Sequence, residues 1–138
     1  MIIRYERNGK VKHGWMVAED QKVRVIEGDI YKIQTAKPIM TGLELPLDEI
    51  SLKAPCDPSK VVCIGLNYRD HAAEMGIDLP KEPLMFLKPS SAVVGPGEPI
   101  VYPKLTANLH YEGELAIVIK KEAKKVKAAD ADEYFLGF

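Results

Sequence analysis

The chain begins with the sequence MIIRYERNGKVKHGWMVAEDQKVRVI, residues 1–26. Three short apolar runs lie in this stretch, at residues 1–7, 11–17 and 22–26. Asn8-Gly9 separates the first two runs, and Glu19-Asp20 precedes the third. Asn-Gly between two such runs is the strongest short-range signal for a β-hairpin. The N-terminus is therefore predicted to form a small antiparallel β unit.

Turn-forming residues follow this unit. Irregular chain is expected through Pro38, Pro46 and residues 51–55. The stretch Pro55-Cys56-Asp57-Pro58 contains two prolines, which resist both helices and central strands, so it is the best candidate for a linker. We therefore predict a small N-terminal β domain over residues 1–55 and a second domain over residues 56–138.

The second domain begins with Val61–Ile64, a β-branched run that ends at Gly65 and predicts a buried strand. Residues 68–75 predict a short helix, with Asn67 as its N-cap and Gly76 as its end. Further strands are expected at residues 84–87, 100–101 and 115–119, with a turn at residues 95–97. Ten prolines and ten glycines among so many short strands favour a mainly β (α+β) fold of sandwich or roll type over a doubly wound sheet.

Composition limits the possible functions. The 138 residues include 19 Lys and Arg against 20 Asp and Glu, so no global field would attract nucleic acid or an anionic membrane. Charges interrupt the N-terminal apolar residues, and no run is long enough to span a membrane, so a cytoplasmic location is expected. Cys56 and Cys63 fit neither a CxxC motif nor a zinc knuckle, and we expect reduced, partly buried thiols.

Two glutamates lie just before the apolar run at residues 115–119, in the sequence Glu112-Gly113-Glu114. In extended chain, residues i and i+2 point to one face about 6.5 Å apart, so both carboxylates can converge on one ion. Oxygen donors suit Mg²⁺, Mn²⁺ or Ca²⁺ better than zinc. Spacing alone, however, favours the solvated face of an amphipathic strand over a metal site.

His71 and Glu74 lie three residues apart, and so on one face of the predicted helix. A carboxylate near an imidazole orients it and raises its basicity, as a water-activating base requires. An ordinary surface histidine is the favoured interpretation when this pair is considered alone. Lys88, at the end of an apolar strand, could bind a substrate carboxylate or be an exposed strand-end lysine. His110 is close to the glutamates in sequence, but a hydrogen-bonded structural role suits it better.

Three blocks of sequence, in this order, resemble the fumarylacetoacetate hydrolase family, especially the branch of 2-hydroxyhepta-2,4-diene-1,7-dioate isomerases and acylpyruvate hydrolases. The blocks are KVVCIGLNYRDHAAE at residues 60–74, PLMFLKP at residues 83–89, and YEGELAIVI at residues 111–119. The resemblance runs from about residue 58 to the C-terminus. Residues 1–55 resemble the small, variable β domain that often precedes it.

The resemblance implies a mixed β-sandwich roll, usually a homodimer. It implies that Glu112 and Glu114 are two of the family's three carboxylate ligands to Mg²⁺. It also implies that His71 and Glu74 form the dyad of a mobile lid helix, and that Lys88 lies near the substrate pocket. The family continues with a segment resembling GYTxxNDxxARD, which holds the third ligand, whereas this sequence ends at Phe138. We therefore expect a truncated catalytic domain.

The resemblance implies an Mg²⁺-dependent enzyme that acts on 2-keto or 2-enol carboxylic acids through a metal-stabilised enolate. His71, oriented by Glu74, would activate water or move a proton. Isomerisation, carbon–carbon hydrolysis of an acylpyruvate and decarboxylation share this enolate, and the sequence does not choose among them. The alternative is a non-catalytic β module or pseudoenzyme whose carboxylates are surface charge. A calcium-binding or phosphoesterase site would leave His71 and Glu74 unexplained.

Overall fold

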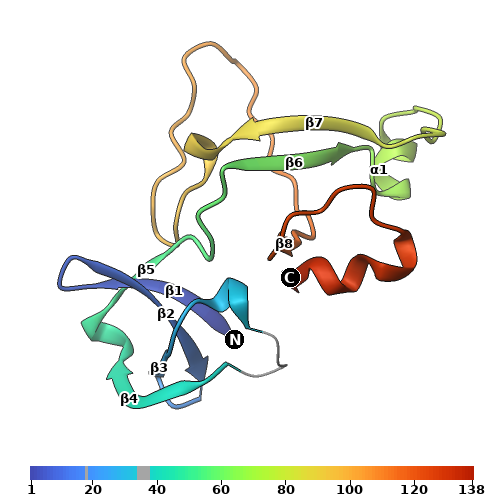
Figure 1. Ribbon diagram of the computed structural model, residues 1–138. Coiled ribbons are helices and arrows are strands. Elements are labelled where there is room, and N and C mark those ends of the chain that lie inside the picture. Colours follow the sequence, from blue (N-terminus) through green and yellow to red (C-terminus); the bar gives the residue numbers. More distant parts are fainter. Residues whose placement is uncertain (18, 34–37) are drawn as a thin grey trace. The chain divides into compact units, whose positions relative to one another are not determined.

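The N-terminal residues form an antiparallel sheet with the strand order β4-β3-β2-β1-β5 (Figure 1). The computed structural model describes residues 1–17, 19–33 and 38–138. Within these residues, the sheet consists of β1 (Ile2–Arg7), β2 (Lys10–Val17), β3 (Lys22–Ile26), β4 (Met40–Pro46) and β5 (Ser51–Lys53). None of the helices in the described ranges is long and apolar enough to cross a membrane.

The Asn8-Gly9 turn joins β1 to β2, as predicted. Asn8 has φ +53° and Gly9 has φ +72°, the left-handed values that a type I′ turn requires at both central positions. The turn sets the register, in which Arg7 pairs with Lys10 and Ile3 pairs with Gly14. The strand at residues 22–26 is also confirmed with its predicted bounds.

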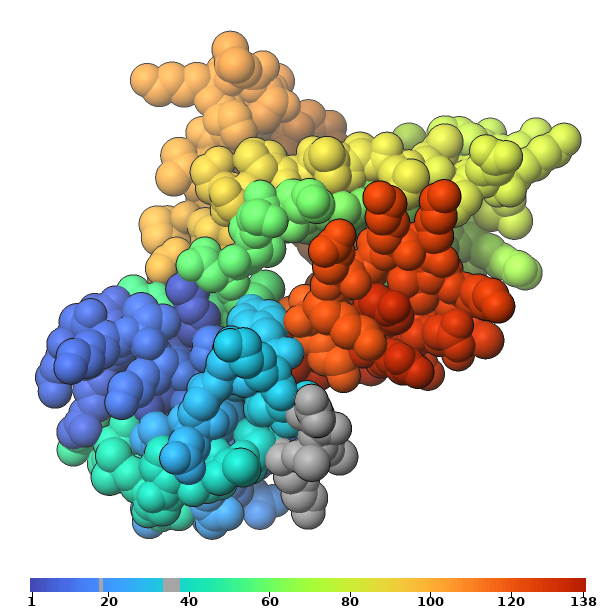
Figure 2. Space-filling model, viewed as in Figure 1, coloured from blue at the N-terminus to red at the C-terminus, as the bar shows by residue number. Residues whose placement is uncertain are grey.

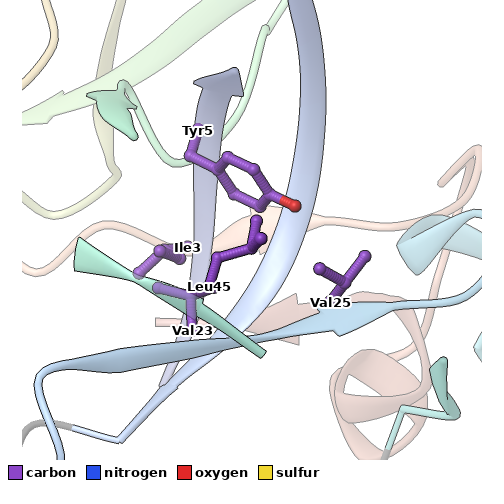
Figure 3. Packing of buried hydrophobic residues seen from close by; sticks show 5 residues of the cluster. All are labelled: Ile3, Tyr5, Val23, Val25 and Leu45. Carbon is purple, nitrogen blue, oxygen red and sulfur yellow. The ribbon is translucent and has the colours of Figure 1, made fainter. Parts of the chain in front are cut away.

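One face of this sheet carries the core (Figure 3). Its buried side chains occupy alternate positions of β1 and β3, with one from β4, because successive residues of a strand face opposite sides of the sheet. They are Ile3, Tyr5, Val23, Val25 and Leu45.

Gly14 has no side chain, and core side chains fill the space that a side chain at this position would need. A Cβ atom at Gly14 would lie 2.2 Å from Val23 Cγ1 and 3.2 Å from Tyr5 Cε1. We expect Gly14→Ala to lower the free energy of unfolding by about 1–3 kcal/mol, because the core must shift to admit the methyl group. Urea unfolding followed through Trp15, the single tryptophan, measures the effect. Gly113→Ala is the control, since nothing lies within 4 Å of that position; equal losses in both variants would contradict the steric explanation.

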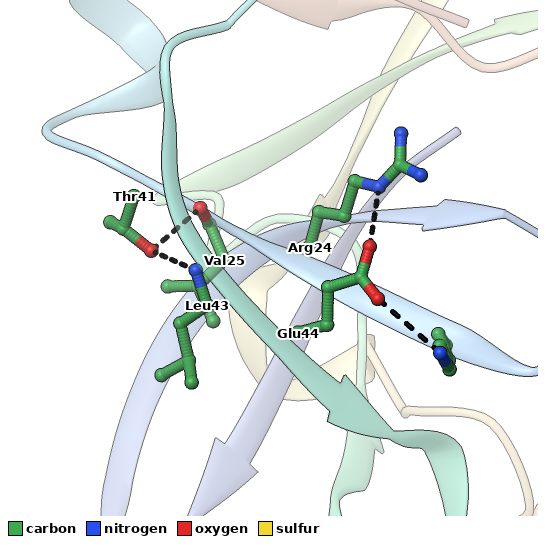
Figure 4. Close-up of polar contacts among 6 residues, drawn as sticks. Arg24, Val25, Thr41, Leu43 and Glu44 are labelled. Carbon is green, nitrogen blue, oxygen red and sulfur yellow. Dashed lines mark hydrogen bonds and ion pairs between the residues drawn. The ribbon is translucent and has the colours of Figure 1, made fainter.

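Polar side-chain contacts between β3 and β4 help to fix the register of β4 (Figure 4). Glu44 accepts hydrogen bonds from Arg24 Nε at 2.9 Å and Lys22 Nζ at 3.4 Å, and these cations lower the pKa of its carboxyl below the usual value. Thr41 Oγ1 donates to the Val25 carbonyl at 3.3 Å and accepts from Leu43 N–H at 3.2 Å. The edge strand is therefore held to β3 by side chains as well as by its backbone.

The prediction of irregular chain after β3 is partly wrong. β4 and β5 are strands, separated by a 3₁₀ helix (Leu47–Glu49), and another 3₁₀ helix covers Ile30–Lys32. Pro46 is compatible with β4 because it ends a strand at the edge of the sheet, where a missing N–H costs little. Residues 34–37 of that stretch lie outside the described residues.

His13 of β2 is half-buried, and its ring meets the Tyr31 ring edge-on at 6.4 Å between centroids. Within the described chain its Nε2 atom is buried without a hydrogen-bond partner. Burial lowers the pKa of His13, the positive charge of Arg4 lowers it further, and Asp29 partly opposes both. Protonation of the folded protein is therefore less favourable than protonation of the unfolded chain.

A pH dependence of stability follows from this lowered pKa. Below about pH 6.5 the unfolded chain takes up a proton at His13 that the folded protein resists, so stability falls as the pH drops toward the folded-state pKa. Above pH 7 this loss disappears. Urea unfolding at pH 5.0, 6.0 and 7.5 should show a smaller acid loss in His13→Gln than in the wild type. Identical pH profiles would contradict the assignment.

The second compact unit covers Asp57–Val94, while residues Gly95–Phe138 group with Met1–Cys56. The unit Asp57–Val94 contains β6 (Lys60–Gly65), α1 (Arg69–Glu74), β7 (Leu84–Pro89) and a 3₁₀ helix (Ser90–Ala92). β6 and β7 run antiparallel, side by side in Figure 1, and both strands were predicted. The boundary between the units, at Cys56–Asp57, falls inside the proline-containing segment 55–58.

The predicted helix is confirmed, but its start is corrected. Tyr68 has extended backbone and is the N-cap, without a side-chain capping bond, so Asn67 does not cap α1. Gly76, with φ +66°, follows the last turn and ends the helix as predicted.

The C-terminal part of the chain contains less strand than predicted. β8 covers Val118–Ile119 and pairs with β9 (Phe135–Gly137) after a 3₁₀ helix at Ala128–Tyr134. Residues 115–117 and 100–101 are irregular in the described structure, and Ile100 and Val101 are 79% and 80% exposed. They belong to none of the sheets in the described part of the chain. The 95–97 turn is confirmed, with Glu98 N–H bonded to the Gly95 carbonyl at 3.2 Å. The described residues nonetheless contain about twice as much strand (35%) as helix (17%), in antiparallel sheets, which confirms the mainly β class.

Candidate active site

The predicted acid–base pair lies on α1, directly after β6. Ala72 is 1% exposed and anchors the helix, whereas His71 is half-buried and Glu74 is exposed. The His71 carbonyl accepts a hydrogen bond from Met75 N–H at 3.0 Å, which continues the helical turn that carries both side chains. Positions three apart lie on one face of a helix, so Glu74 is placed where it can orient the imidazole.

An open hollow of about 370 Å³ lies beside the start of this helix. The end of β6, the residues Asn67 and Arg69, and the loop at 79–83 line it. Arg69 and Lys81 bring two cations to its wall, together with Glu82. A carboxylate-bearing ligand is the natural match for that chemistry. Sequence reasoning missed Lys81, because nothing local in a proline-flanked loop indicates that it meets the end of a strand.

Lys88 lies on β7 in the same unit, opposite Val61. The side chain is exposed, and its Nζ atom lies 5.9 Å from the centre of the Phe86 ring. That distance is at the outer limit of a cation–π contact, so the ammonium group remains available to an anion. The assignment of Lys88 to substrate binding stays a prediction.

Glu112 and Glu114 belong to the other unit, in irregular chain ahead of β8, and not at the start of a strand as predicted. Both are exposed, and no atom lies within 4 Å of a Cβ built on Gly113 between them. His110, two residues before Glu112, is exposed as well.

The carboxylates of Glu112 and Glu114 are oxygen donors, the kind of ligand that a hard cation prefers. Mg²⁺ commonly binds one or two carboxylates and keeps water or substrate oxygens in its other positions. Among the residues that the structure describes, no three His, Cys, Asp or Glu side chains gather closely enough to hold a metal ion. Glu112 and Glu114 can therefore supply two ligands, and the remaining ones must come from water, substrate or further protein groups. Cys56 and Cys63 are free and half-buried, as predicted.

Comparison with known proteins identifies the family. Residues 60–138 match the family model described as fumarylacetoacetate (FAA) hydrolase, C-terminal, and residues 1–55 match the model described as Rv2993c-like, N-terminal. The chain belongs to the fumarylacetoacetate hydrolase family. The resemblance drawn from residues 60–119 is thereby confirmed.

Three relatives illustrate the membership. Protein Rv2993c of Mycobacterium tuberculosis is 50% identical over 101 residues, which is 73% of this chain and 38% of that protein. The mitochondrial oxaloacetate tautomerase fahd2 of Xenopus laevis is 41% identical over 109 residues, 77% of this chain and 34% of the relative. The crystal structure of 2-hydroxyhepta-2,4-diene-1,7-dioate isomerase from Mycobacterium marinum matches 97% of this chain and 50% of its own, with 34% identity and a TM-score of 0.77. The chain thus spans half, or less, of the length of these relatives.

Proposed function

We propose that the complete gene product relocates a proton on a 2-keto or 2-enol carboxylic acid in an Mg²⁺-dependent reaction. The match of residues 60–138 to the family carries this proposal. Its relatives include one named as an oxaloacetate tautomerase and one named as a 2-hydroxyhepta-2,4-diene-1,7-dioate isomerase. Tautomerisation and isomerisation each move a proton next to an oxygen-bearing carbon and need no water. Proton relocation is therefore favoured over carbon–carbon hydrolysis and decarboxylation.

Glu112 and Glu114 would hold the Mg²⁺ ion through their carboxylates. When bound, the ion would supply Lewis-acid polarisation of the substrate oxygen at C2. Both glutamates are exposed to solvent.

His71 would act as the proton carrier. Its imidazole takes a proton from C3 of the keto form, the C–H electron pair becomes the C2–C3 double bond, and the oxygen at C2 receives a proton. The substrate gains and loses no atoms. Glu74 would orient the ring and stabilise its protonated form, since the two side chains share one face of α1. Lys88, Arg69 and Lys81 would bind the substrate carboxylates.

Oxaloacetate is a test substrate whose products distinguish tautomerisation from decarboxylation. The enol form absorbs in the ultraviolet, so we expect the complete gene product with Mg²⁺ to accelerate its conversion to the keto form without release of pyruvate or carbon dioxide. Acylpyruvate is tested in parallel. Pyruvate released from acylpyruvate faster than oxaloacetate tautomerises would favour hydrolysis, and pyruvate with carbon dioxide from oxaloacetate would favour decarboxylation. Inactivity toward both acids with and without Mg²⁺ would favour a non-catalytic module.

A further inference from the structure

The chain turns from β6 toward α1 at Leu66, whose backbone is left-handed with φ +51°. Residues with a Cβ atom rarely adopt this conformation, and for a bulky side chain it is strained. In the described parts of the chain, the other non-glycine residues with positive φ are Asn8, Gln21 and Lys125, which are polar and lie in turns or bends. Leu66 is the apolar exception, and strain of this kind concentrates at functional sites.

The helix that follows Leu66 depends on its entry for its direction. α1 has six residues, and its N-cap, Tyr68, makes no side-chain capping bond. Before Leu66 the chain is held by β6, whose last residue, Gly65, pairs with Leu84 of β7. After it, the helix is anchored by the buried side chain of Ala72. Leu66 lies between these two fixed points, so its backbone angles decide how α1 leaves the end of β6.

Glycine is the usual residue in a left-handed conformation, and the far end of α1 has one. Gly76, with φ +66°, ends the helix without strain. At the near end a leucine takes the same conformation, which indicates a use for its side chain. Leu66 is half-buried and lines the hollow together with Asn67 and Arg69. The loop after α1, yellow-green in Figure 2, lies at this end of the β6–β7 pair and contributes residues 79–83 to the same lining.

We propose that Leu66 is a positioning residue for His71: its left-handed backbone directs α1 so that the imidazole meets the reacting carbon, while its side chain forms part of the wall of the hollow. This inference rests on the proposed role of His71 in proton transfer. Leu66 acts on the chemistry only through the helix. A change in its backbone preference should therefore alter the turnover of bound substrate, and a loss of its side chain should alter substrate binding.

Two substitutions at Leu66 separate the backbone from the side chain. Isoleucine has the same atoms as leucine, but its branched Cβ makes the left-handed conformation far less accessible. In the complete gene product, Leu66→Ile should lower kcat on oxaloacetate about tenfold or more with KM nearly unchanged, since a displacement of about 1 Å can cost on the order of 10²-fold. Leu66→Gly adopts positive φ freely, so it should keep kcat within about twofold of the wild type and raise KM.

Leu87→Ile is the matched control, because it makes the same exchange on the strand β7, where a branched Cβ is favoured. Its kcat and KM should equal those of the wild type. Amide hydrogen exchange gives a second measurement that needs no substrate or metal. The N–H groups of Ala72 and Met75, which donate to the carbonyls of Tyr68 and His71 at 3.1 and 3.0 Å, should exchange faster in Leu66→Ile than in the control. Circular dichroism of each variant confirms that the protein is folded.

Three results would overturn the proposal. The first is wild-type kcat in Leu66→Ile, and the second is exchange in that variant as slow as in the control. The third is an equal loss of kcat in Leu66→Ile and Leu66→Gly, which would assign the effect to the side chain. If Leu66→Ile does not fold, the kcat of Leu66→Gly decides alone. If the wild type does not tautomerise oxaloacetate, the proposed function is wrong, and the exchange rates still support or overturn the control of α1 by Leu66.

Discussion

His71→Ala should lower the turnover of the complete gene product on oxaloacetate by about 10²- to 10⁴-fold, the usual contribution of a positioned general base. The affinity for Mg²⁺ should change little, because the proposed ligands, Glu112 and Glu114, lie on a different segment from α1. Stopped-flow loss of the enol absorbance gives the rate, and calorimetric titration with Mg²⁺ gives the affinity.

The control is His13→Gln, which removes an imidazole from β2 and should keep wild-type turnover at pH 8. Glu74→Gln should lose less turnover than His71→Ala, because the amide can still orient the imidazole while the general base remains. Wild-type turnover in His71→Ala would mean that α1 has a structural role only.

Glu112→Ala and Glu114→Ala should each weaken Mg²⁺ binding by about 100-fold or more. Removing a group that merely supports a metal ligand typically costs 10- to 100-fold, and a direct ligand contributes more. Both side chains are exposed in irregular chain, so neither substitution removes a core contact. Calorimetric titration of the complete gene product with Mg²⁺ and with Mn²⁺ measures the loss.

Glu122→Ala is the matched control, since it removes the same charge from an exposed position further along the chain. It should leave the affinity unchanged. If the two ligand variants bind Mg²⁺ as tightly as this control, the glutamates are only surface charge, and the ion, if required, binds elsewhere.

The sequence predicts those elements of the fold that are specified by neighbouring residues in the chain. Asn8-Gly9 specifies a turn through its backbone preferences, and the apolar run at residues 22–26 specifies a strand with the bounds that the structure shows. β4 was missed because Gly42 and Pro46 interrupt its sequence pattern, while its pairing depends on β3 and on Glu44 meeting Arg24. The pattern of the strand alone contains none of that information.

The candidate site was likewise predicted only where local sequence signals specify it. Helical spacing places His71 beside Glu74 from sequence alone, and α1 confirms the helix. The strand expected at residues 115–119 covers only Val118–Ile119, because apolar composition does not specify which strand a segment pairs with. The contribution of Lys81 to the hollow was likewise invisible, since it depends on a loop returning to the end of β6.

The strand order of the first sheet also has a consequence for how the protein folds. β1 to β4 form a meander in which each strand pairs with the next, and the turns between β1 and β2 and between β2 and β3 are short. β5 instead pairs with β1, opposing Ser51 to Glu6 and Leu52 to Tyr5 across roughly 45 residues of chain. Contacts between residues so far apart slow folding, because chain entropy is lost before the contact forms. We infer that the hairpins of the meander form first, and that β5 closes the sheet after the transition state.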